Sequence, residues 1–184
     1  IYLSHPNFES FEYQELKHKF KTGDLILFHG LDNINPIFIG TYYGHVGIIY
    51  IDPQDETQTP YLFEAFNPGT MAFFPEECKS GIVLNQLEHR LNSYRGYCFY
   101  KELEGPVCIS EQIGFGNFIN YALKNMYYNQ SIISNGLSKL IFNEELHTGT
   151  NCAELVYLSL IKLSVLDIDY LKNNMKHHLY WLAN

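Results

Sequence analysis

The chain has 184 residues, of which 46% are hydrophobic and 17% are charged. This balance is typical of a globular domain and excludes a disordered chain. The formal net charge of −8 argues against a surface that binds nucleic acid, because following phosphates requires clustered Lys and Arg. We expect one domain, residues 1–184, which at this size buries a core without a metal or disulfides.

Strands dominate the first half of the predicted structure. A short helix is expected near the N-terminus, within residues 8–19, and a Thr-Gly-Asp turn follows it at 22–24. Apolar runs then predict a strand at each of 25–28, 44–51 and 61–66, with further strands at 71–74, 82–84 and 97–103. A helical turn is expected around Leu87 and Leu91, which are spaced i, i+4.

The hydrophobic period changes after Ser110. Apolar residues indicate a helix from 110 to about 128, although Gly114 and Gly116 weaken it. Residues 129–149 look irregular, and a clear helical spacing covers 151–164. A last amphipathic helix is expected at 171–182. Strands first and helices later predict an α+β domain with an antiparallel sheet.

The four cysteines are spaced too irregularly for a zinc ribbon, since no CxxC pair occurs among Cys78, Cys98, Cys108 and Cys152. They are too few for a disulfide scaffold, so we expect reduced thiols in a cytoplasmic or virion-associated, reducing compartment. We see no signal peptide, and the longest apolar stretch, 36–51, is too short for an integral membrane span.

Cys152 is the first candidate for chemistry. Asn151 is a good helix N-cap, and Glu154 stands three residues later, where a capping-box acid belongs. Cys152 would then occupy the first helical position, where free N–H groups and the helix dipole lower a thiol pKa and help hold an oxyanion. The alternative is a small apolar residue on a buried helix face.

His45 and Glu64 are polar residues inside otherwise apolar predicted strands. Alternation places His45 on one side with Gly47, which would leave open space for a helix end to approach the imidazole. A buried carboxylate needs a partner, and a His on the adjacent strand would supply one. The alternatives are a core histidine bonded to backbone and a solvated acid on an edge strand. Together with Cys152, the pair favours a Cys nucleophile with a His base.

These segments carry a resemblance to a known superfamily. They resemble the circularly permuted NlpC/P60 papain-like proteins, in which the His strand precedes the Cys helix. The similarity covers roughly residues 22–164 and rests on four motifs: GDLILF at 23–28, GHVGIIY at 44–50, FEA at 63–65 and NCAELV at 151–156. A Glu at position 64 and the residues after Cys152 place the chain with the YiiX-like and poxvirus-type branch, rather than with the related lecithin:retinol acyltransferase branch.

The resemblance implies a permuted papain-like fold and a thiol hydrolase that cleaves an amide or ester bond through a thioester. It implies Cys152 as nucleophile, His45 as base and Glu64 as orienting acid, with no cofactor or metal. The substrate would be a peptide amide, an isopeptide or a lipid amide. Two alternatives stay open: a non-catalytic structural or binding protein, for example of a large DNA virus particle, and a lipid acyltransferase or phospholipase. The sequence leaves the oligomeric state open.

Other residues are weaker candidates. Asp24 reads as a turn former, and the Gly-Phe-Gly motif at 114–116 reads as a helix irregularity rather than a nucleotide-binding loop. We interpret Cys78, Cys98 and Cys108 as structural. The remaining polar or aromatic residues near the expected site or in the C-terminal helix, read as surface or packing residues, are His29, Tyr42, Tyr43, His177 and His178.

Overall fold

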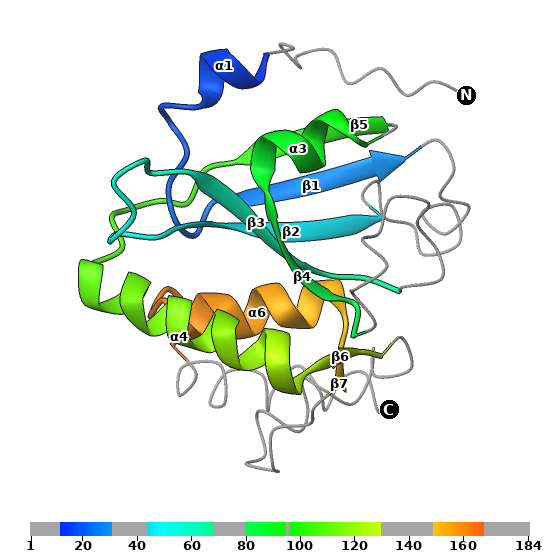
Figure 1. Ribbon diagram of the computed structural model, residues 1–184, viewed down its shortest axis with the longest axis vertical. Helices are drawn as coiled ribbons and strands as arrows, with labels where there is room; N and C mark the ends of the chain where they lie inside the picture. The colour runs from blue at the N-terminus through cyan, green and yellow to red at the C-terminus, as the bar shows by residue number, and fades with distance from the viewer. Residues whose placement is uncertain (1–11, 31–43, 68–79, 95, 130–148, 168–184) are drawn as a thin grey trace, which may run out of the picture.

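A computed structural model describes residues 12–30, 44–67, 80–94, 96–129 and 149–167 (Figure 1). Over these residues the chain is a mixed α/β fold in which a five-stranded antiparallel sheet packs against helices. The predicted α+β class with an antiparallel sheet is therefore confirmed. The strand expected at 71–74 and the helix expected at 171–182 lie outside the described residues.

The sheet has the order β4-β3-β2-β1-β5. Its strands are β1 (Leu25–Gly30), β2 (His45–Ile51), β3 (Pro60–Ala65), β4 (Ile82–Gln86) and β5 (Gly96–Lys101). All four strand pairings are antiparallel. Strands β2 and β3 lie inside the sheet and are buried along most of their length, which explains why they read as nearly continuous apolar runs.

Helices cover both faces of the sheet (Figure 1). On one face α4 (Ile109–Asn125) and α6 (Cys152–Lys162) pack on Ile48 and Phe63. On the other face α1 (Tyr13–Leu16) and α3 (Leu87–Asn92) pack on residues that include Phe28 and Leu62. The core is thus split into two layers, and α3 and α6 approach the sheet from opposite sides.

Two short strands were not predicted. The helix expected to reach about residue 128 ends at Asn125, and β6 (Tyr127–Tyr128) follows it. It pairs in parallel with β7 (Gly149–Thr150), which directly precedes α6. A pair of two-residue strands has no hydrophobic period to detect, although this pairing lies directly before α6.

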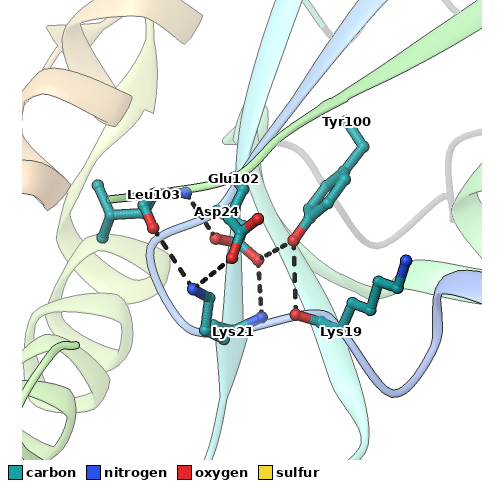
Figure 2. Close-up of polar contacts among 6 residues, drawn as sticks. All are labelled: Lys19, Lys21, Asp24, Tyr100, Glu102 and Leu103. Carbon is teal, nitrogen blue, oxygen red and sulfur yellow. Dashed lines mark hydrogen bonds and ion pairs between the residues drawn. The ribbon is translucent and has the colours of Figure 1, made fainter. Parts of the chain in front are cut away.

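The turn before β1 is held by a buried carboxylate, that of Asp24. It accepts hydrogen bonds from the Lys21 amide at 2.8 Å, the Leu103 amide at 2.9 Å and the Tyr100 hydroxyl at 2.7 Å (Figure 2). Gly23 before it has φ +102°, a conformation that favours glycine. Asp24 therefore acts as a turn former, tying the beginning of β1 to the segment that follows β5.

Gly116 allows α4 to approach β2. Helix α4 runs unbroken through both glycines, so the expected irregularity does not occur. A Cβ at Gly116 would overlap the hydroxyl of the buried Tyr50, whereas a Cβ at Gly114 would meet open space. The glycine at 116 is thus a packing requirement rather than a weakness of the helix.

Replacing Gly116 with Ala should destabilise the fold by about 1–3 kcal/mol, the usual cost of overpacking. Gly114→Ala is the matched control and should be neutral or stabilising, because alanine favours the helix more than glycine. Urea unfolding followed by circular dichroism measures both changes. If the overlap is the cause, adding Tyr50→Phe to Gly116→Ala should recover part of the loss. Equal stabilities for the two alanine variants would contradict this account.

Candidate active site

The structure brings Cys152, His45 and Glu64 together. The beginning of β2, the end of β3 and the beginning of α6 lie at the same end of the sheet (Figure 1). Nε2 of His45 lies 2.9 Å from Oε2 of Glu64. The side chains of His45 and Cys152 also interact, since each shifts the pKa of the other. Because Nε2 faces the carboxylate, Nδ1 is the imidazole nitrogen left for the thiol.

Cys152 is the first residue of α6, as predicted. The Asn151 side chain caps the helix by accepting a hydrogen bond from the Glu154 amide at 3.0 Å. Only this half of the expected capping box forms, and the Glu154 side chain is buried. The Ala153 amide helps to lower the pKa of the Cys152 thiol, so the helix N-terminus favours negative charge on sulfur.

The backbone of β2 also favours the ionised form of the Cys152 thiol. The paired register between β2 and β3 runs from Ile51 opposite Pro60 to Ile48 opposite Phe63 and stops there. Val46 lies beyond this register, and its amide instead helps to lower the pKa of Cys152. The end of the β2–β3 pairing is thus the place where the thiol contacts the sheet.

The expectation about Gly47 was wrong. No open space lies beside it, because a Cβ at this position would come within 2.9 Å of Cγ and Cδ1 of Leu62. Gly47 therefore makes room for Leu62 in the layer opposite to α6. The helix does not approach His45 across Gly47; Cys152 reaches it at the end of the sheet, where β2 begins.

Electrostatics at the site favour a thiolate–imidazolium pair. Burial alone would lower the pKa of His45, but its interactions with Cys152 and Glu64 raise that pKa to about 9. Burial would raise the pKa of Cys152, yet the hydrogen bond and charge of His45 and the Val46 and Ala153 amides lower it overall. Each group stabilises the charged form of the other, which is how catalytic thiols are activated.

Glu64 is fully buried at 0% exposure, which rules out a solvated acid at the edge of the sheet. Desolvation would raise its pKa, but hydrogen bonding and charge from His45 and Arg90 lower it. Its Oε1 accepts a hydrogen bond from Nε of Arg90 at 2.7 Å and one from the Asn85 amide group at 3.4 Å. The carboxylate is therefore held on both oxygens.

Arg90 was missed by sequence reasoning. It lies on α3 with a relative exposure of 8%, three residues after Leu87 and next to Leu91. The signal was present in the predicted helical turn, because a residue at i+3 from Leu87 falls on the same face as Leu91. A buried Arg there needs a carboxylate, and Glu64 was the acid already expected to be buried.

Aromatic rings surround the polar group. The imidazole of His45 lies 5.3 Å from the ring of Phe28 and 6.1 Å from that of Phe66, between ring centroids. Tyr128 on β6, another residue that sequence reasoning missed, has a pKa raised by burial and by the charge of Cys152. These rings limit water around the imidazole and strengthen its interactions with its charged partners.

The remaining candidates do not join this group. His29 lies on β1 with its ring stacked on that of Tyr97 at 6.5 Å. Cys98 and Cys108 are free thiols on exposed residues. Cys78, Tyr42, Tyr43, His177 and His178 lie outside the described residues. Within the described part of the chain, no group of three His, Cys, Asp or Glu side chains is arranged to hold a metal ion.

Comparison with known proteins finds no family model that matches the chain and no curated protein that matches it. Among the described helices, none is both long enough and apolar enough to cross a bilayer.

Proposed function

We propose that the chain is a thiol hydrolase with a permuted papain-like fold, in which Cys152 is the nucleophile, His45 the base and Glu64 the orienting acid. The observation that carries the proposal is the group at one end of the sheet in which Nε2 of His45 lies 2.9 Å from the Glu64 carboxylate and the imidazole and the Cys152 thiol shift each other's pKa. A nucleophile bonded to a base that is itself oriented by a third group is the arrangement of nucleophilic acyl transfer.

The proposed reaction is acyl transfer to water. The Cys152 thiolate attacks a carbonyl carbon, and the developing oxyanion is stabilised by an N–H group at the start of α6. His45 gives its proton to the leaving amine or alcohol as the carbon–nitrogen or carbon–oxygen bond breaks, which leaves a thioester on sulfur. His45 then takes a proton from water, which attacks the thioester and releases the acid and the thiolate.

A peptide amide, an isopeptide or a lipid amide fits this chemistry. The net charge of −8 favours a neutral or basic substrate over an acidic one. Glu64 keeps the imidazole turned toward the thiol throughout, since Nε2 stays on its carboxylate. The expected pH dependence follows from these groups: activity falls above about pH 9, where His45 loses the proton it must donate.

Labelling with iodoacetamide tests the activation of the thiol. At pH 6 Cys152 should react at least about tenfold faster than Cys98, because a thiol with a lowered pKa is far more ionised at that pH. Cys98 is a matched control: it is an exposed residue, yet burial of its thiol raises its pKa to about 11. Mass spectrometry of the labelled peptides over a pH series measures both rates.

The variant His45→Ala should remove the advantage of Cys152 at pH 6, since the imidazolium that stabilises the thiolate is gone. Labelling of Cys98 should stay unchanged in that variant. If wild-type Cys152 reacts no faster than Cys98 across the series, the hydrolase proposal fails and a non-catalytic binding protein is favoured.

A further inference from the structure

Both oxygens of the Glu64 carboxylate are used, each by a different cationic side chain. Oε2 lies 2.9 Å from Nε2 of His45, and Oε1 accepts from Nε of Arg90 at 2.7 Å. A carboxylate bonded on one oxygen alone is free to rotate about its last bond. With Arg90 on the second oxygen, that rotation is stopped in the position that presents Oε2 to the imidazole.

Arg90 also balances the charge of the buried group. With His45 protonated and Cys152 ionised, neighbouring groups carry alternating charges. Arg90 and His45 are positive, and Glu64 and Cys152 are negative. Opposite charges alternate and sum to zero. Removing Arg90 would leave this group with a net negative charge around a carboxylate that is 0% exposed, which disfavours the ionised form of Glu64.

Aromatic rings hold the guanidinium in place. The carbon at its centre lies 4.6 Å from the ring centroid of Phe28 and 5.4 Å from that of Tyr94. Phe28 packs on the His45 ring as well, so one side chain positions both cations. A guanidinium suits this setting better than an ammonium, since its delocalised charge interacts well with aromatic rings while Nε donates at a fixed angle.

From these contacts we infer that Arg90 is a positioning residue, which holds the Glu64 carboxylate in the orientation that contacts His45. The inference rests on the proposed function of the Cys152, His45 and Glu64 group. Among the described residues, the groups that also influence Arg90 or Glu64 include the amide of Asn85 on β4, at 3.4 Å from Oε1, and the Cys98 thiol on β5, whose pKa both charges influence.

The test is the pH profile of Cys152 alkylation by iodoacetamide in Arg90→Met, Glu64→Gln and the double variant. Without Arg90, the ionised form of Glu64 should be less stable, which in turn makes the His45 imidazolium and the Cys152 thiolate less stable. The acid limb of the profile should therefore move to higher pH by about one unit or more. Glu64→Gln should shift it in the same direction. The double variant should shift it no further than Glu64→Gln alone, because Arg90 acts through that carboxylate.

Two further variants test whether the charge of Arg90 matters and whether the effect is specific to this position on α3. Arg90→Lys keeps the positive charge and should shift the limb less than Arg90→Met. His89→Gln, at an exposed neighbour on α3, should leave the profile unchanged. If Arg90→Met does not fold, Arg90→Lys against wild type and the double variant against Glu64→Gln give the same two comparisons. A folded Arg90→Met with the wild-type midpoint overturns the inference, and so does a double variant that shifts further than Glu64→Gln.

Alkylation needs no turnover, so this inference and the proposed function fail separately. A protein that hydrolyses no ester or amide but shows the Arg90→Met shift overturns the hydrolase and retains the positioning role. A protein that turns over substrate without that shift retains the hydrolase proposal and overturns the positioning role of Arg90.

Discussion

Replacing Cys152 with Ser should abolish turnover of an activated ester such as p-nitrophenyl acetate, by about 10³-fold or more. The hydroxyl fills nearly the same space as the thiol, but it is far more weakly acidic, so His45 at neutral pH leaves it unionised. Wild-type protein should show a burst of p-nitrophenolate as Cys152 becomes acetylated, followed by slower release. Stopped-flow absorbance and intact-protein mass measure the burst and the acetyl group.

The control is Cys98→Ser, which should keep the burst, since the pKa of that thiol is raised and the thiol stays protonated at neutral pH. The Cys152→Ser variant should unfold at a urea concentration close to that of wild type, which separates lost chemistry from lost folding. A burst that survives in Cys152→Ser would place the nucleophile elsewhere.

Replacing Glu64 with Gln should cost about 3–5 kcal/mol of unfolding free energy at pH 7. The reason is Arg90, which is buried at 8% exposure and would lose the anion that its Nε contacts. Breaking a buried ion pair from one side costs this much because the remaining charge stays buried without the anion that it was paired with. Urea unfolding monitored by circular dichroism measures the loss, and an unchanged unfolding midpoint would contradict it.

The Lys21–Glu102 ion pair provides a control on the surface. Its atoms are equally close, at 2.7 Å, but both side chains are largely exposed. Glu102→Gln should therefore change the unfolding free energy little, since solvent screens the pair. The pH dependence has a definite sign as well. The pKa of Glu64 is lowered in the folded state, so its contribution is present above the unfolded pKa and is lost as the pH falls through the folded value.

The sheet and the first turn of α6 were predictable because their signals are local. Strands β2 and β3 are buried on both faces, so their sequences are long apolar runs in which one His and one Glu are conspicuous. The Asn-Cys-Ala-Glu segment carries its own cap, and the structure starts α6 at Cys152. Local patterns of this kind are sufficient to predict Cys152, His45 and Glu64 as candidate site residues.

How the members meet depends on contacts between distant segments. Arg90 lies 26 residues from Glu64, and the packing of α3 against the sheet, which no local period encodes, decides that they touch. The sequence predicted open space beside Gly47, but the side chain of Leu62, from another strand, occupies it. The parallel pairing of β6 with β7, which brings Tyr128 near Cys152, likewise joins segments about twenty residues apart.

The amide of Val46, left over where the β2–β3 pairing stops, belongs to the main chain and is carried by any residue except proline. Alanine scanning is blind to such a donor, and a proline there would distort the strand along with removing the group. Its share in holding the sulfur is accessible only to a backbone amide-to-ester exchange made by chemical synthesis. Side-chain substitutions at this site will therefore leave the contribution of the Val46 amide to the stability of the thiolate unmeasured.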